Sequence, residues 1–143
     1  MADAHSDARS GREARPNRPL SPHLQIYKPL VNMVMSIIHR MTGAALYLGS
    51  LLLAWWLIAA AVGPDYFNYV ESWFATWPGK LILVGYTWAL LHHMLGGLRH
   101  FLWDTGHGYD LDMIDKLSWG SIALSLAATA VIWISVAKPF GGV

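Results

Sequence analysis

The chain has 143 residues, of which 55% are hydrophobic and only 13% are charged, and its mean hydropathy is +0.35. This composition is too apolar for a soluble domain of this length, so it indicates an integral membrane protein with a single domain. The net charge of +1, without a basic cluster along one helix face, argues against nucleic acid as a partner. The chain has no cysteine, which excludes disulfides, iron–sulfur ligation and covalent haem attachment.

The N-terminal part of the chain differs from the rest in composition. Residues 1–17 are polar and lack periodicity, so we expect them to form a disordered tail. Residues 18–143 then make up one membrane-anchor domain. Within it, Ser21 followed by Pro22 matches an N-cap with proline at the first helical position, which predicts a short surface helix where the tail meets the membrane.

Three long apolar segments predict three membrane-spanning helices. The first covers about residues 31–62, and its uncharged part, 41–62, is alone long enough to cross a hydrocarbon core of about 30 Å. Aromatic residues then recur at helical spacing over about 66–77, which predicts an amphipathic helix in the membrane interface. The second span covers about 81–103. The third, about 117–136, has no ionisable residue, so we assign it a packing role. The predicted fold class is therefore all-α and integral to the membrane.

The positive charges predict how the helices are oriented. Lys and Arg residues concentrate before the first span, and this bias places the N-terminus in the cytoplasm. If the chain were mitochondrial, the same bias would place the N-terminus in the matrix, but we expect the inner membrane of a bacterium. Because the chain crosses once and returns, the loop after the second span lies on the same side as the N-terminus.

The second span contains ionisable residues, which are costly inside a membrane. An arginine near the bilayer centre costs roughly 2.5–3.5 kcal/mol, so such residues mark a functional site by default. His93, Gly97 and His100 share one helix face, on which an imidazole can bind haem iron while the glycine lets the macrocycle lie close. His92, with Gly96 four residues later, is a rival ligand. Helical geometry alone does not choose between the two histidines.

The depth of these residues also favours a haem. His93 lies near mid-bilayer, about 15 Å along the axis from the end of the span. Arg99 and His100 lie roughly 9–10 Å nearer the cytoplasmic surface, where they can bind the propionates of a haem whose iron is at His93. The alternative is that the histidine bonds a neighbouring helix and that Arg99 extends to the membrane surface. We favour haem, because these residues occur together. Without cysteine, it must be b-type.

A low-spin b haem in a membrane bundle normally takes two axial imidazoles from facing helices. In this chain we expect only the second span to offer histidines near mid-bilayer, since the depth estimates put His39 about 15 Å or more from the level of His93. We therefore predict that a second membrane subunit supplies the other ligand. This chain would then form half of a haem-binding bundle, with one haem shared between two subunits.

The first span carries a second polar group. Ser36, Arg40 and Gly43 recur at helical spacing, with His39 beside them. A hydroxyl and a guanidinium can donate hydrogen bonds to the two carbonyls of a quinone headgroup. Asp104, at the end of the second span, lies at a similar depth and can orient Arg40 or pass protons. Spacing alone supports an alternative equally well. In it, Ser36 hydrogen-bonds the helix backbone, and His39 and Arg40 anchor the helix at the membrane interface.

Three motifs together resemble a known family. The segments 18–27 (RPLSPHLQIY), 36–43 (SIIHRMTG) and 93–104 (HMLGGLRHFLWD) resemble the cytochrome b556 membrane-anchor subunits of succinate dehydrogenase, respiratory complex II. The resemblance extends over about residues 18–138. It implies that the axial ligand of the haem iron is His93 and that the residues approaching the propionates include His39 and His100. It also implies that the ubiquinone site is lined by Ser36 and Arg40.

The resemblance further implies three partners: a flavoprotein subunit with covalent FAD, an iron–sulfur subunit and a second small membrane anchor. Electrons would pass from succinate through FAD and the clusters to ubiquinone, near the N-terminal side of this subunit. This chain has no cysteine for a cluster and no dinucleotide-binding fold, so we expect no succinate-oxidising site on it. Two other functions stay open, the anchor of a quinol:fumarate reductase and a haem-free scaffold that tethers the soluble subunits.

Overall fold

The computed structural model describes residues 21–140, which form helices and no strand. Three of the helices are long and apolar enough to cross a membrane: α2 (Val31–Val62), α4 (Trp77–Asp104) and α5 (Leu111–Phe140). The prediction of an all-α membrane protein with three spans is therefore confirmed. The predicted disordered tail, 1–17, lies outside the described residues.

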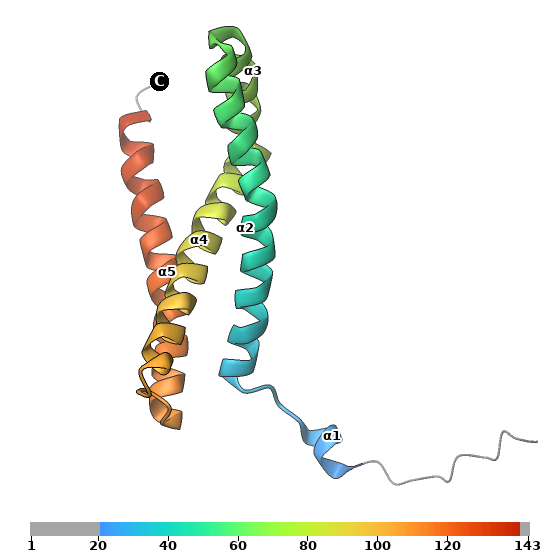
Figure 1. The fold of residues 1–143 in the computed structure, drawn as a ribbon, viewed down its shortest axis with the longest axis vertical. Helices are drawn as coiled ribbons and strands as arrows, with labels where there is room; N and C mark the ends of the chain where they lie inside the picture. The colour runs from blue at the N-terminus through green and yellow to red at the C-terminus, as the bar shows by residue number, and fades with distance from the viewer. Residues whose placement is uncertain (1–20, 141–143) are drawn as a thin grey trace, which may run out of the picture.

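The three long helices form a bundle in which α4 contacts both of the others (Figure 1). The short helix α3 (Pro64–Ala75) reverses the chain between α2 and α4, and it follows Gly63, whose φ of 141° favours glycine. A tight loop with Gly106 and Gly108 at positive φ then joins α4 to α5. As a result α2 and α5 both run antiparallel to α4. The N-terminal end of α2 therefore lies near the C-terminal end of α4.

The first helix, α1 (Pro22–Ile26), lies away from the bundle (Figure 1). It begins as the sequence predicts, with Pro22 in its first turn after Ser21. The Ser21 side chain makes no capping hydrogen bond. Of the two predicted features, only the proline therefore favours the start of the helix, because its φ is already close to the helical value.

Two of the long helices begin earlier than the apolar segments do. The helix α4 starts at Trp77 rather than near 81, because the Thr76 side chain caps it by accepting a hydrogen bond from the Gly79 N–H. The helix α5 starts at Leu111 rather than near 117, and Asp112 in its first turn interacts favourably with the helix dipole. Both helices thus continue as polar turns beyond the apolar segment.

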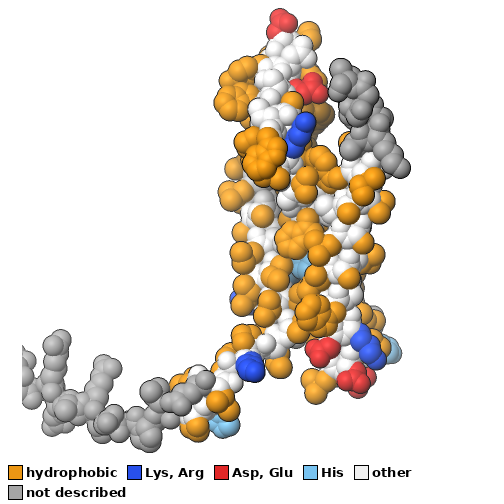
Figure 2. Space-filling model, turned by 180° about the vertical axis from the view of Figure 1, so that it is seen from behind, with side chains coloured by type: hydrophobic (Ala, Val, Ile, Leu, Met, Phe, Trp, Pro, Cys, Tyr) orange, Lys and Arg blue, Asp and Glu red, His pale blue; other side chains and the backbone are white. Residues whose placement is uncertain are grey.

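The outside of the bundle is apolar and much of its inside is polar. Figure 2 shows hydrophobic side chains along the length of the bundle, with acidic and basic side chains gathered toward its two ends. This is the distribution expected of helices surrounded by lipid, where polar side chains face other helices. The buried polar residues among those described are Thr42, His92, Arg99, Ser118, Ser121, Ser125 and Thr129.

Candidate functional site

The interface of α2 and α4 brings two histidines into direct contact. The rings of His39 and His93 are parallel to within 4°, with their centroids 3.9 Å apart. The prediction that His39 lies about 15 Å or more from the level of His93 is therefore wrong. That estimate counted depth from the uncharged segment of α2. The polar turn before that segment instead belongs to the same helix, and its His39 lies against His93 in the middle part of α4.

Two glycines make this close approach possible. A Cβ atom on Gly43 of α2 would lie 3.0 Å from Cε1 of His93, and a Cβ on Gly96 of α4 would overlap the ring of His39. Each helix therefore provides a backbone surface against which the imidazole of the other helix lies, as small residues do at membrane helix interfaces. Gly97 differs, since a Cβ at that position would meet no atom within 4 Å.

The hydrogen bonds of His93 determine which of its nitrogens carries the proton. Its Nδ1 lies 3.1 Å from the backbone carbonyl oxygen of His39 and 3.4 Å from the hydroxyl of Thr42. A carbonyl oxygen can only accept, so Nδ1 is the donor and Nε2 keeps its lone pair. A carbonyl that holds one ring nitrogen in this way is typical of histidines that ligate a metal through the other. His93 thus has the tautomer that a metal ligand needs.

His92 lies on another side of α4 and is enclosed by α5. Its side chain is 1% exposed, its ring stacks on Trp88, and its Nδ1 lies 3.3 Å from the hydroxyl oxygen of Ser125. Its Nε2 is buried without a partner. A macrocycle cannot approach a ring enclosed between two helices of the same chain, so the geometry favours His93 over His92 as a ligand.

His100 and Arg99, which the sequence placed together near the propionates, point to different neighbours. His100 is exposed, and its ring lies 5.7 Å from that of His39, centroid to centroid. Arg99 is 7% exposed, and its Nη1 donates a hydrogen bond of 3.0 Å to the hydroxyl of Ser118 on α5. His100 therefore joins the two stacked histidines, whereas Arg99 faces the interface of α4 and α5.

The residues predicted to bind quinone lie at the same end of the bundle. Ser36 and Arg40 are exposed, one turn apart on α2, and Asp104 is exposed at the C-terminal end of α4. No ion pair joins Arg40 to Asp104 in the part of the chain that the structure describes. The predicted role of Asp104 in orienting Arg40 therefore stays a prediction.

A polar interface between α4 and α5 was not predicted from the sequence. The third span was expected to serve only for packing, but Ser118 and Ser125 of that helix bind the buried Arg99 and His92. The signal that could have found this interface is the recurrence of small hydroxyl residues at helical spacing: Ser118, Ser121, Ser125 and Thr129.

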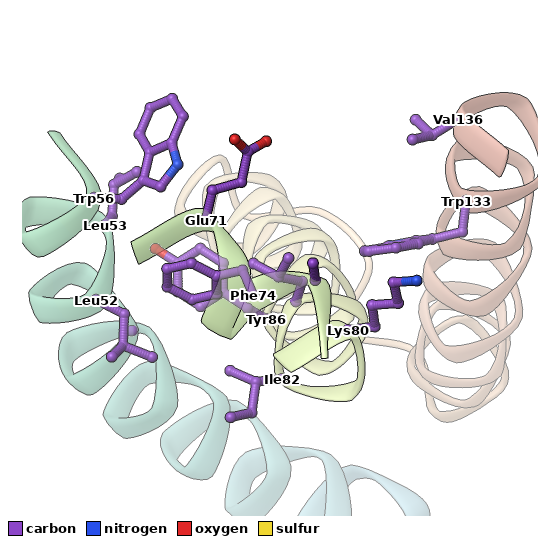
Figure 3. Close-up of a pocket in the computed structure, with 13 residues that line it drawn as sticks. Leu52, Leu53, Trp56, Glu71, Phe74, Lys80, Ile82, Tyr86, Trp133 and Val136 are labelled. Atoms are coloured by element: carbon purple, nitrogen blue, oxygen red, sulfur yellow. The ribbon is translucent and has the colours of Figure 1, made fainter. Parts of the chain in front are cut away.

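A cavity of about 590 Å³ at the opposite end of the bundle, beside α3, also went unpredicted (Figure 3). In Figure 3, Trp56 on α2 and Trp133 on α5 lie on its two sides, with Tyr86 of α4 between them. Among the described residues that line it, only Glu71 and Lys80 are charged. None of these described lining residues is a histidine, so the cavity is separate from the histidine site.

The ring nitrogens of His93 and His39 suit the binding of a haem. His93 Nε2 has the lone pair that the iron requires, and His39 has a buried Nδ1 with no hydrogen-bond partner. The Nδ1 of His39 lies against Gly96 of α4, so Nε2 of that ring is the nitrogen that could donate to a propionate. The residues present are therefore compatible with b haem.

The sequence also matches a family of known proteins. The model of the family described as "Succinate dehydrogenase/Fumarate reductase transmembrane subunit" matches residues 14–132. This chain belongs to that family. As a transmembrane subunit it is part of an enzyme complex, and the resemblance seen in its motifs is confirmed.

Individual relatives are similar over most of their length. The succinate dehydrogenase cytochrome b556 subunit of Paracoccus denitrificans is 40% identical over 124 residues, covering 84% of this chain and 95% of the relative. The subunit of the same name from Rickettsia felis is 35% identical over 117 residues, covering 82% and 91%. The cytochrome b560 subunit of Reclinomonas americana is 30% identical over 123 residues, covering 82% and 85%. The transmembrane subunit is thus similar to membrane-anchor cytochrome b subunits of succinate dehydrogenase.

Proposed function

We propose that this transmembrane subunit binds one haem b and ubiquinone in a succinate dehydrogenase, and that electrons from the iron–sulfur subunit reach the quinone at this subunit. The observation that carries the proposal is the hydrogen bond between His93 Nδ1 and the His39 carbonyl, which leaves Nε2 of His93 available to iron. The names of the relatives, cytochrome b556 subunits, support a b haem.

In this proposal His93 is the axial ligand, and the haem propionates accept hydrogen bonds from His39 and His100. The position of His100 beside the His39 ring supports these roles. When bound, the haem supplies a one-electron redox centre inside the membrane. The predicted contact of Arg99 with a propionate stays a prediction, because its guanidinium lies against α5.

The second axial ligand comes from a second small membrane anchor in this proposal. His39 lies level with His93 and not about 15 Å or more from it, but the stacking of the two rings is a separate reason to expect the second ligand elsewhere. Two axial imidazoles must point at the iron from opposite sides, whereas these two rings lie face to face on the same side. His92 is enclosed by α5. A histidine of another subunit is therefore the remaining source.

Ser36 and Arg40 are the proposed quinone ligands. Both are exposed in the first turns of α2, at the end of the bundle where α4 ends with Asp104. Their hydroxyl and guanidinium groups can donate to the two quinone carbonyls, and Asp104 is a candidate for delivering protons as the quinone is reduced.

The remaining partners follow from the family. We propose that the flavoprotein subunit with FAD and the iron–sulfur subunit associate with this anchor on its N-terminal side, and that this side is cytoplasmic. The bacterial relatives support a bacterial inner membrane as the location. The lack of cysteine agrees with clusters held by another subunit.

The direct test is the absorption spectrum of the purified complex, oxidised against dithionite-reduced. A b-type α band on reduction is the expected result, and a complex that is active without any haem signal would show that the chain is a scaffold. The family also includes fumarate reductase subunits. Redox titration of the haem and the bound quinone distinguishes succinate oxidation from fumarate reduction, since a quinone of low potential favours fumarate reduction.

A further inference from the structure

A groove between α4 and α5 combines positive charge with an apolar wall. It has a volume of about 330 Å³ and is lined by Arg99, Lys116, Ser121 and five leucines of the two helices. It lies near the loop between α4 and α5, outside the contact of His39 with His93. The groove is therefore a second candidate binding region, distinct from the proposed haem site.

Arg99 is the unusual residue of this groove. Its side chain is 7% exposed, and its guanidinium carbon lies 5.7 Å from the centre of the Trp103 ring. Among the described residues its one hydrogen bond is to Ser118, an uncharged partner, and its Nε is buried without a partner. No carboxylate forms an ion pair with it among residues 21–140. A guanidinium buried without a counter-charge is unfavourable, so an anionic group from outside the chain is expected to neutralise it.

Lys116 places a second cation beside the same groove. The acidic residues nearest to it on α5, Asp112 and Asp115, do not line the groove. Arg99 lies about 7.5 Å along the axis from the end of α4, and Lys116 lies about the same distance from the start of α5. Both cations are thus within about 7.5 Å of the ends of their helices, from where such long side chains can extend toward the level of the lipid headgroups.

We propose that this groove binds an acidic phospholipid, with its phosphate at Arg99 and Lys116 and an acyl chain along the leucines. The apolar wall favours a lipid over inorganic phosphate, because a free phosphate ion has no apolar part that could pack against the leucines. A haem propionate is the other anion that could meet Arg99, but Nη1 of Arg99 donates to Ser118 of α5, on the side of α4 where the groove lies.

The test uses the purified complex, delipidated in mild detergent and then supplied with phosphatidylglycerol or phosphatidylcholine. Native mass spectrometry counts the lipids retained, and haem content is measured on the same samples. We expect phosphatidylglycerol to be retained in preference to phosphatidylcholine, and excess inorganic phosphate not to displace it. Arg99→Gln and Lys116→Gln should each weaken retention by about tenfold, the effect of losing one charge-assisted hydrogen bond.

Lys80→Gln is the matched control, because Lys80 is an exposed lysine at the opposite end of the bundle. It should retain phosphatidylglycerol as the unmodified complex does. If Arg99→Gln fails to assemble, Lys116→Gln alone decides the outcome. Equal retention of both lipids, or unchanged retention in Lys116→Gln, would overturn the proposal. Loss of haem with unchanged lipid in Arg99→Gln would also overturn it and would assign Arg99 to a propionate.

Discussion

The imidazole of His93 donates from Nδ1 to the backbone carbonyl of His39, 3.1 Å away, while its ring stacks on the His39 side chain. One residue of α2 therefore both sets the tautomer of His93 and restricts the orientation of its ring. This pairing gives the proposed ligand a fixed direction before any cofactor is bound. It also shows why the adjacent His92, which bonds α5, is not equivalent.

Replacing each of the two histidines separately tests this assignment. His93→Ala should abolish the α band of the reduced complex, because the iron loses an axial ligand. His92→Ala should keep the band but lower the melting temperature, since it leaves a cavity beside Trp88 at a cost on the order of 1–3 kcal/mol. Difference spectra and thermal melts of the purified complexes measure both effects. A complex that keeps its band without His93 and loses it without His92 would reverse the assignment.

Gly96→Ala tests whether the close contact of α2 and α4 supports the site. The new Cβ would overlap the ring of His39, so the helices must separate or the ring must turn, at a cost of roughly 1–3 kcal/mol. We expect a lower melting temperature and reduced haem content. Gly85→Ala on the same helix is the matched control, because a Cβ there meets no atom within 4 Å. Equal effects of the two substitutions would mean that this contact is not specific.

The quinone site is tested by comparing two assays. Ser36→Ala and Arg40→Leu should lower succinate–quinone turnover far more than succinate oxidation with an artificial acceptor that takes electrons from the soluble subunits. Each lost hydrogen bond should cost roughly 1–3 kcal/mol, with the larger loss at the charged Arg40. Ser50→Ala, an exposed serine further along α2, is the control and should leave both assays unchanged. Parallel loss in the two assays would indicate defective assembly instead of a quinone site.

Expressing this chain without its companion anchor tests the shared haem. The chain should insert into the membrane but contain little or no low-spin b haem, because His39 and His93 lie face to face and cannot ligate one iron from opposite sides. Electron paramagnetic resonance of the isolated subunit measures this directly. A stable bis-imidazole signal from this polypeptide alone would show that both ligands come from it, and the proposal of a second anchor as ligand donor would be abandoned.

The sequence by itself was enough for the fold class, the three spans and the family. Apolar length along the chain is a local property, and a membrane crossing depends on little else. The motifs of α2 and α4 were also readable, since they consist of residues at fixed spacing within one helix. The same local information identified His93 and His92 as candidates but offered no means of separating them.

Only the tertiary structure decided which neighbour each of these side chains meets. The register of α2 against α4 depends on Gly43 and Gly96, whose small size matters only once the two helices face each other. That register brings His39 level with His93, which counting residues from the membrane edge could not reveal. The position of α5 likewise encloses His92 and turns Arg99 toward Ser118. Contacts between helices depend on how the helices cross, and the spacing of residues within a single helix does not determine that crossing.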